Sequence, residues 1–471
     1  MATAKAEAIR QADTAFFGHP RGLAWLSFSE VWERFSYYGM QALLVLYMTH
    51  QLLQPGHVEN VAGFAPFRVV IEKVYGPLSP LALASVIFGL YAGLVYLTPI
   101  GGGILADRFI GRTRAVIVGA TLMAIGHFLM AFDVSFLLAL LCLLVGVGCF
   151  KGNIATQVGD LYALGDPRRA DAYQIYMFGI QLAVIVSPFV CGTLGQVYGW
   201  HWGFGAAGVG MVIGLIVYLS GRAWLPPEPP IVRRKDKTVR SRLTVAELRT
   251  VLALAALVPA LALASVANQQ IFNAYLVWGE ANYQLVFFGK TMPITWILSF
   301  GSIISALMIA ISVMFWRWWG RRWTEPDEVT KLVIGILIAA VAPLTLAAAS
   351  AIVASSGQRV GLGWALAFEI INDLGFANIF PVGLALFSRA APKSLGSMML
   401  GVFYLHLFAG NMLVGWLGGF LERMSGSAFW LLHAGLITAS AVFILVIRGV
   451  AGRVLAPMAE PESEIQVAWA T

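Results

Sequence analysis

The sequence predicts an all-α polytopic membrane protein with twelve transmembrane helices in two bundles of six. Of its 471 residues, 59% are hydrophobic and only 12% are charged, about half the charged fraction of a typical soluble protein. Apolar runs of about 20 residues, long enough to cross a bilayer, recur along the chain. Most lysines and arginines fall in short segments between these runs, on one side of the resulting topology.

Six helices are expected in the first half of the chain, one for each apolar run. A polar tail covers residues 1–20, and the first helix is expected from about residue 21 to 53. A long loop follows, with a short amphipathic segment at 61–75 that we place at the outer surface. The next five helices are expected at residues 80–105, 113–132, 135–163, 170–194 and 202–224.

An abrupt change in composition separates the two halves. Four prolines follow Leu225 and exclude a helix there, and the basic residues after them repel one another and extend the chain. We therefore expect a linker at 226–245 between a first bundle at 21–225 and a second bundle at 246–456. The helices of the second bundle are expected at 246–279, 291–318, 329–355, 361–388, 394–421 and 428–450, and a tail at 457–471 ends the chain.

Basic residues orient these helices. With the amino terminus inside, about 24 of the 31 lysines and arginines lie on the inner side and about 5 lie outside, as the positive-inside rule requires. Both termini are then expected in the cytoplasm, and the protein is expected to be a multi-pass protein of the plasma membrane, or of the inner membrane in a bacterium. The net charge of +7 is explained by topology, so we expect the lipid bilayer and no nucleic acid as a partner.

The sequence offers little support for metal or enzyme chemistry. The three cysteines, Cys142, Cys149 and Cys191, lie in apolar runs, where we expect buried thiols and neither a disulfide nor a metal site. The chain contains neither an H-E-x-x-H motif nor paired aspartates at metal-ligand spacing, so an intramembrane enzyme is not expected. We expect a monomer without cofactor.

Charged residues inside the first and fourth predicted helices mark the candidate site. Glu30, Glu33 and Arg34 gather on one side of helix 1, and Lys151 lies near the middle of helix 4. A charge near the bilayer centre costs roughly 2.5 to 3.5 kcal/mol and normally faces a polar cavity on an ion or substrate path. These four groups are therefore expected to share protons and to meet an anionic substrate group. The alternative is a structural ion pair between Lys151 and one of the acids.

The loop after the second helix is a candidate gate. Its sequence from Gly101 to Arg114 combines glycines, which allow close approach of helices, with Asp107 and Arg108, the start of a charge cluster at the inner end. We expect this cluster to break and re-form as two halves rock against each other. The alternative is a basic turn that only fixes topology.

These motifs resemble those of the proton-coupled oligopeptide transporter family of the major facilitator superfamily. The signature E-x-x-E-R-F-x-Y-Y-G matches Glu30–Gly39 without exception, and F-K-x-N-I matches Phe150–Ile154. The helix 2 pattern that ends in A-D-R matches Val95–Arg108, and P-V-G-L of helix 10 matches Pro381–Leu384. The resemblance implies two six-helix bundles that import di- and tripeptides by alternating access.

The resemblance also implies roles for individual residues, with the proton as the coupling ion. Glu30, Glu33, Arg34 and Lys151 handle protons and the peptide carboxylate, and Arg34 and Lys151 also bind substrate. The other residues expected to line the pocket are Tyr37, Tyr38, Tyr91, Gln181, which replaces the family's helix 5 asparagine, and Asn268, which stands in place of a helix 7 acid. A glutamine retains the hydrogen-bonding groups of asparagine.

Other positions depart from the family pattern. The helix 10 glutamate that receives the peptide amino group is replaced by Phe376, and the helix 8 asparagine by Gly301. At the outer gate Gln41 stands where many members have arginine, and Glu280 is displaced by one residue from the expected acid.

Two further acids of helix 10 offer a replacement for the missing glutamate. Glu369 and Asp373 precede Phe376 on the same helical stripe, so we expect one of them to receive the substrate ammonium. The alternative is an outer-mouth salt bridge or water network. Two other functions also remain open: proton-coupled transport of another small anionic or zwitterionic solute, and an uncoupled transporter-like sensor.

Overall fold

The computed structural model describes residues 13–163, 165–226, 228, 244–392 and 395–455. It is almost entirely helical, and ten of the described helices are long and apolar enough to cross a membrane. Helices α2 (Arg21–Tyr47) and α5 (Arg112–Leu129) run alongside these ten and complete the bundles. The predicted multi-pass helical membrane protein is thereby confirmed. Most of the predicted linker and both chain ends lie outside the described residues.

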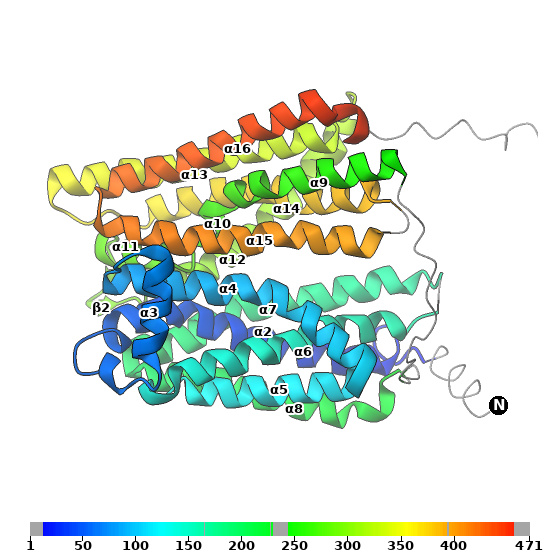
Figure 1. Ribbon diagram of the computed structural model, residues 1–471, viewed down its shortest axis with the longest axis horizontal. Helices are drawn as coiled ribbons and strands as arrows, with labels where there is room; N and C mark the ends of the chain where they lie inside the picture. Colours follow the sequence, from blue (N-terminus) through cyan, green and yellow to red (C-terminus); the bar gives the residue numbers. More distant parts are fainter. Residues whose placement is uncertain (1–12, 164, 227, 229–243, 393–394, 456–471) are drawn as a thin grey trace, which may run out of the picture.

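The first bundle contains α2 and the five helices that follow the outer loop. Its remaining elements are η1 (Met48–Leu52), η2 (Val58–Asn60), α3 (Phe64–Tyr75), α4 (Pro80–Leu105), η3 (Ala106–Ile110), α5, η4 (Asp133–Ser135), α6 (Phe136–Asp160), α7 (Arg168–Thr193), η5 (Leu194–Tyr198), α8 (Trp200–Ser220) and η6 (Arg222–Trp224). Helix α2 is largely buried and packs along both α7 and α8. The predicted amphipathic segment forms α3, which lies across one end of the bundle (Figure 1).

The second bundle contains the remaining helices and one short hairpin. Its elements are α9 (Val245–Ala264), α10 (Val266–Gln270), α11 (Ala274–Asn282), β1 (Val286–Phe287), β2 (Lys290–Thr291), α12 (Trp296–Gly320), α13 (Glu328–Ser356), α14 (Gly363–Ala390), α15 (Gly396–Gly418), η7 (Gly419–Glu422) and α16 (Gly426–Leu455). Strands β1 and β2 pair antiparallel in the loop between α11 and α12. Cys149 and Cys191 are buried free thiols, as predicted, while Cys142 is only half-buried.

The seventh predicted helix is the main difference from expectation. We expected one helix over 246–279, but the chain leaves the helix at Ser265 and again at 271–273. Polar side chains satisfy the backbone at the second break: the Gln270 Oε1 accepts from the Ala274 N–H at 3.3 Å, and the Asn273 Nδ2 donates to the Val414 carbonyl at 3.3 Å. The Gln270 bond is local and competes with the regular helix, whereas the Asn273 bond ties the irregular segment to α15.

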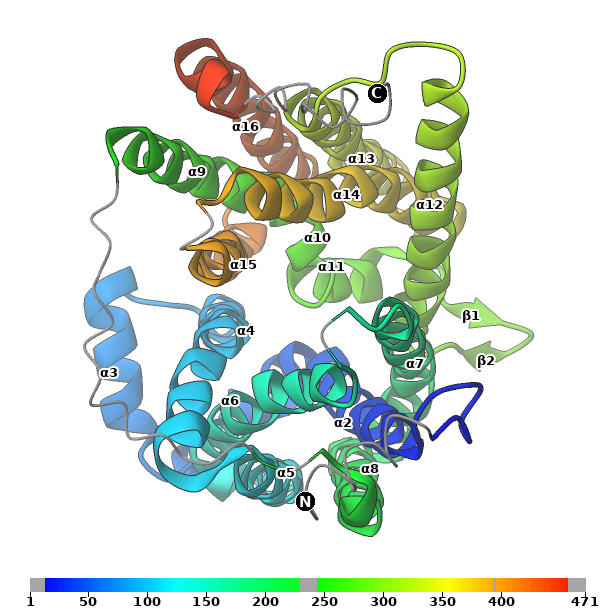
Figure 2. The same cartoon turned by 90° about the vertical axis from the view of Figure 1, so that its right-hand side faces the viewer.

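The two bundles meet along two pairs of helices. Helix α4 packs on α15, and α7 packs on α12 (Figure 2). The α4–α15 contact is close because Gly89 has no side chain. A Cβ atom there would lie 2.5 Å from the Asn411 carbonyl oxygen and 2.7 Å from the Gly415 Cα. We call the end at which α2 ends the outer end and the opposite end the inner end, after the predicted orientation.

Candidate functional site

The charged motif of α2 is buried and internally paired. Glu30, Glu33 and Arg34 are 2%, 0% and 3% exposed. The Arg34 guanidinium forms a two-point contact with Glu33, in which Nη2 donates to Oε1 at 2.7 Å and Nε to Oε2. Its Nε also lies 3.2 Å from the Glu30 Oε1. One cation therefore serves two acids, and the Glu30 Oε2 is left without a hydrogen-bond partner.

Lys151 lies on α6 without a carboxylate partner. Its Nζ lies 5.3 Å from the centre of the Tyr96 ring, a cation–π contact, and no carboxylate of the described chain lies within 4 Å of it. The expected alternative of an ion pair between Lys151 and Glu30 or Glu33 is therefore wrong in this conformation, since Arg34 holds both acids. Our sequence reasoning missed Tyr96, although it lies inside the matched helix 2 pattern.

Aromatic side chains surround the α2 cluster. The Arg34 guanidinium lies over the Tyr37 ring at 5.1 Å, and Tyr37 contacts Tyr38 edge to face. Tyr38 also meets Phe272, which belongs to the unwound segment of the second bundle. Tyr91 on α4 is 2% exposed, and its hydroxyl has no hydrogen-bond partner. Polar groups without partners in a buried site are available to a ligand.

Two predicted pocket residues have weaker support from their contacts. Gln181 is half-buried on α7, and no hydrogen bond of its side chain is recorded in the part of the chain that the structure describes. Asn268 on α10 accepts from Gln269 at 3.4 Å, and Gln269 in turn accepts from Asn411 on α15 at 3.1 Å. The amide chain links the irregular segment after α9 to the helix that packs on α4.

The two acids of α14 form a second buried cluster. Glu369 and Asp373 are 2% and 4% exposed, and among the described residues no lysine, arginine or histidine pairs with either. The alternative of an outer-mouth salt bridge is therefore not realised. Phe376 stacks on Phe380, with the ring centroids 5.7 Å apart.

The predicted inner gate is confined to one bundle. Asp107 lies 3.5 Å from Arg112, whose Nη1 donates to Asp160 at 2.5 Å, and Arg108 is exposed. All these residues belong to the first bundle. In the described ranges, the recorded side-chain hydrogen bonds between the bundles all lie at the opposite, outer end.

At the outer end Glu280 is paired with a histidine, His50, that the sequence did not indicate. The Glu280 Oε2 on α11 lies 2.6 Å from the His50 Nε2 in η1, and the His50 ring stacks on Trp200. Gln41, which occupies the position of the family's arginine, is buried and its Oε1 has no hydrogen-bond partner. Only the fold brings His50 to Glu280, because 230 residues separate them along the chain.

Four more hydrogen bonds join the bundles at this end, one of them from the Thr295 N–H to the Gln196 Oε1 at 3.3 Å. The Trp296 Nε1 donates to the Thr193 Oγ1 at 2.8 Å, and the Thr295 Oγ1 donates to the Gln196 Oε1 at 3.0 Å. The Ser79 hydroxyl donates to Glu422. With the His50–Glu280 pair, these bonds hold the outer ends of the two bundles together.

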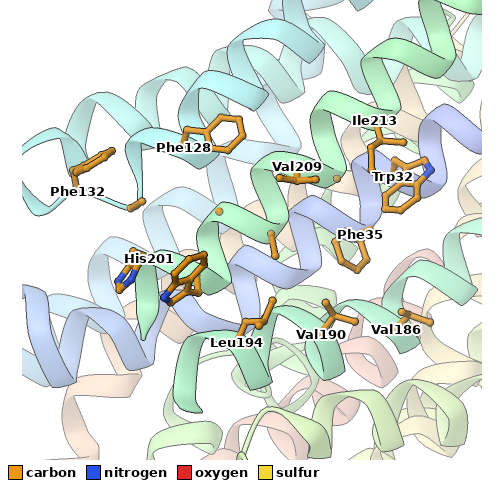
Figure 3. A pocket seen from close by; sticks show the side chains of 15 residues that line it. Trp32, Phe35, Phe128, Phe132, Val186, Val190, Leu194, His201, Val209 and Ile213 are labelled. Atoms are coloured by element: carbon orange, nitrogen blue, oxygen red, sulfur yellow. The ribbon is translucent and has the colours of Figure 1, made fainter. Parts of the chain in front are cut away.

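The hollow drawn in Figure 3 is separate from both charged clusters. It has a volume of about 930 Å³ and lies between α5, α7 and α8, and Trp32 and Phe35 of α2 also line it (Figure 3). Its lining is apolar apart from His201 and the indole N–H groups of Trp32 and Trp202, and no predicted site residue contributes to it. It therefore offers no charged side chain to the ends of a peptide.

Comparison with known proteins places these clusters in context. The family model described as "POT family" matches residues 113–240. The peptide transporter YePEPT of Yersinia enterocolitica is 27% identical over 92% of this chain and 94% of its own. A di-/tripeptide transporter of Lactococcus lactis is 27% identical over 84% of this chain and 88% of its own.

Solved structures show the same architecture. A crystal structure of a peptide transporter POT in complex with sulfate superposes with a TM-score of 0.80 at 26% identity, covering 97% of this chain and 100% of that one. A mutant of that transporter in complex with alafosfalin gives a TM-score of 0.81 at the same identity, covering 97% and 99%. The similarity extends over both bundles and is not confined to the matched motifs.

Proposed function

Because the chain belongs to the POT family, we propose that it is a proton-coupled symporter that imports di- and tripeptides by alternating access between its two bundles. The observation that carries this proposal is the buried cluster of Glu30, Glu33 and Arg34, together with Lys151, which has no carboxylate of the described chain within 4 Å. The proton is the coupling ion, and short peptides and the bilayer are the partners. We propose a monomer in the plasma membrane, the inner membrane if the source is bacterial, with both termini in the cytoplasm.

Proton coupling follows from competition for Arg34. While Glu33 is ionised, its two-point contact occupies the guanidinium. A proton on Glu33 removes one of the two acids, and Arg34 then becomes available to the carboxylate of a peptide. Lys151, which has no acid within ion-pair distance, supplies the second positive charge. Binding of a peptide carboxylate therefore favours protonation of Glu33, which links proton and peptide movement.

The second bundle is proposed to receive the other end of the peptide. Glu369 and Asp373 on α14 take the role of the family's helix 10 glutamate, whose position is occupied by Phe376. Asn268 on α10 provides an amide. The tyrosines Tyr37, Tyr38 and Tyr91, together with Gln181, line the space between the two ends. A dipeptide has a carboxylate and an ammonium group, and the two bundles offer a basic and an acidic partner respectively.

The test is uptake into proteoliposomes. We expect dialanine to accumulate when an inward proton gradient is imposed, and an excess of nitrate not to compete. Binding of dialanine without gradient-dependent uptake would favour a sensor. Equal competition by nitrate would favour an anion transporter. Comparing dialanine with its amino-blocked form separates peptide transport from transport of any small anion.

We propose that the pair of His50 and Glu280 is the outer gate. Gln41, which stands where many family members have arginine, carries no charge and cannot form an ion pair there. We also propose that Asp107 and Arg108 act at the inner gate. Both outer residues are partly exposed, with 47% and 33% of their side chains accessible, so the pair contributes roughly 1 kcal/mol or less. Replacing either residue by alanine should reduce the preference for outer closure up to about fivefold, measured as a distance distribution between spin labels on η1 and α11.

This gate should respond to pH. The hydrogen bond to Glu280 raises the pKa of His50, which lies beyond the end of α2. The pair's contribution to closure is therefore full below about pH 6.5, the ordinary histidine value, and is lost as pH rises through the raised pKa. Asp133, another acid at the outer end, is bonded to Tyr47, Gln51 and His57. In His50→Gln the pH dependence of closure should disappear; if it persists, His50 is not the group that titrates.

A further inference from the structure

The acids of α14, unlike the acids of α2, have no cation partner among the described residues. Glu369 and Asp373 lie one turn apart on one face of the helix, and the Glu369 Oε1 and the Asp373 Oδ2 have no hydrogen-bond partner. The α2 acids share Arg34, whereas no cation of the described chain reaches the α14 pair. The empty site therefore contains two acids with nothing to balance two negative charges.

The surroundings of Glu369 are neutral on every side. On α12 a Cβ atom at Gly301 would lie 2.9 Å from the Glu369 Oε2, so the carboxyl fills the space of the missing side chain. On α11 the Tyr275 hydroxyl faces Glu369 and accepts a hydrogen bond from Tyr283 at 3.4 Å. The nearby histidine of α16, His433, is bonded to Gln270 instead. The titratable groups that face Glu369 are thus Asp373 and phenols, which carry no charge near neutral pH.

The surroundings of Asp373 are neutral as well. Ser305 of α12 and Asn372 of its own helix face it. Asn372 is 1% exposed, and its Nδ2 completes no hydrogen bond. A buried donor and a buried acid oxygen, both without a partner and close to each other, are available to a polar ligand group.

We infer that the Glu369–Asp373 pair holds one proton while the site is empty and releases it when the ammonium group of a peptide binds. Two neighbouring buried carboxylates without a cation repel each other, and one proton shared between them removes this repulsion. An incoming ammonium supplies the missing positive charge. The O–H bond of the protonated carboxyl then breaks, the proton passes to water, and the ammonium donates to both carboxylates. The net charge of the site is the same before and after.

This inference rests on the proposed ammonium role of the pair and gives the two ends of the peptide opposite effects on protons. Binding at the α2 cluster favours uptake of a proton, because the peptide carboxylate displaces Glu33 from Arg34. Binding at the α14 pair releases one. The number of protons bound with a peptide is therefore smaller than the α2 cluster alone would give, and an amino-blocked peptide lacks this second effect.

The experiment counts protons by calorimetry of the purified full-length protein. Dialanine and N-acetyl-dialanine are titrated at about pH 6 in two buffers of different ionisation enthalpy, where the free amino group is almost fully protonated. We expect dialanine binding to release about one proton more per molecule than N-acetyl-dialanine binding. Equal counts for the two ligands would overturn the inference. This comparison needs no variant, so it stands even if a substitution impairs folding.

Variants then assign the exchange to the pair. In Glu369→Gln and in Asp373→Asn one carboxyl remains, which can stay ionised without a neighbouring charge, so the extra proton should vanish and dialanine should bind more weakly. The matched control is Glu325→Gln, an exposed acid bonded to Lys331, which should change neither quantity. Weaker dialanine binding with an unchanged proton count would refute the exchange but leave the ammonium site intact. Unchanged dialanine affinity in both variants would refute the ammonium site itself.

Discussion

Glu33→Gln should abolish gradient-driven peptide uptake while preserving exchange of peptide across the membrane. Glutamine has the shape of the protonated acid but cannot lose a proton, so the variant mimics the protonated transporter permanently. Arg34 keeps its contact with Glu30 at 3.2 Å, so the substitution does not leave a buried cation without an acid. Proton movement stops because the residue that competes for Arg34 no longer titrates.

The measurement pairs two assays on the same proteoliposomes. Uptake driven by an inward proton gradient is expected to fall to the level of liposomes without protein, and counterflow with peptide on both sides is expected to retain a measurable fraction of the wild-type rate. Glu72→Gln is the matched control, because Glu72 lies on the outer helix α3 and pairs with Arg68 at 2.9 Å, away from the bundles' centre. Equal loss of both activities would assign Glu33 a role in folding or substrate binding instead of coupling.

The α2 cluster could be predicted from sequence because its members are neighbours along one helix. Spacing of three and four residues is sufficient to place Glu30, Glu33 and Arg34 together in any helical fold. Lys151 could be placed at the same depth, but its surroundings could not, since the Tyr96 ring reaches it from another helix. Charge pairing follows distance in space, and Arg34 is closer to both acids than Lys151 is.

The outer gate and the broken helix could not be predicted for a related reason. His50 and Glu280 belong to different bundles, and η1 and α11 must each be positioned before the two side chains meet. At the break at 271–273, Asn273 donates to the carbonyl of Val414, 141 residues away, and only the folded chain provides this partner. An apolar run predicts that a segment crosses the membrane, but it does not predict where buried amides interrupt the helix.

Lys151→Ala should remove the preference of the transporter for a free peptide carboxylate. Its Nζ faces a ring and no acid, so the wild-type site holds a positive charge that a substrate anion can pair with. A hydrogen bond to a charged group contributes about 1.5 to 3 kcal/mol, which corresponds to roughly 10- to 150-fold in affinity. We expect dialanine to lose affinity by this factor in Lys151→Ala and dialanine amide, which lacks the carboxylate, to lose little.

The ratio of the two affinities is the quantity to measure, because it cancels general effects of the substitution on folding. Lys331→Ala is the control: this lysine pairs with the exposed Glu325 at the inner end of the second bundle, so its removal should leave the ratio unchanged. If Lys151→Ala weakens dialanine and dialanine amide equally, the lysine supports the pocket without contacting the carboxylate. In that case Arg34 alone receives the carboxylate, and the peptide competes with Glu33 for this one residue. A selective loss for dialanine would instead mean that the peptide carboxylate contacts both Arg34 of α2 and Lys151 of α6. The carboxylate then links the two helices, whose positive charges otherwise repel each other.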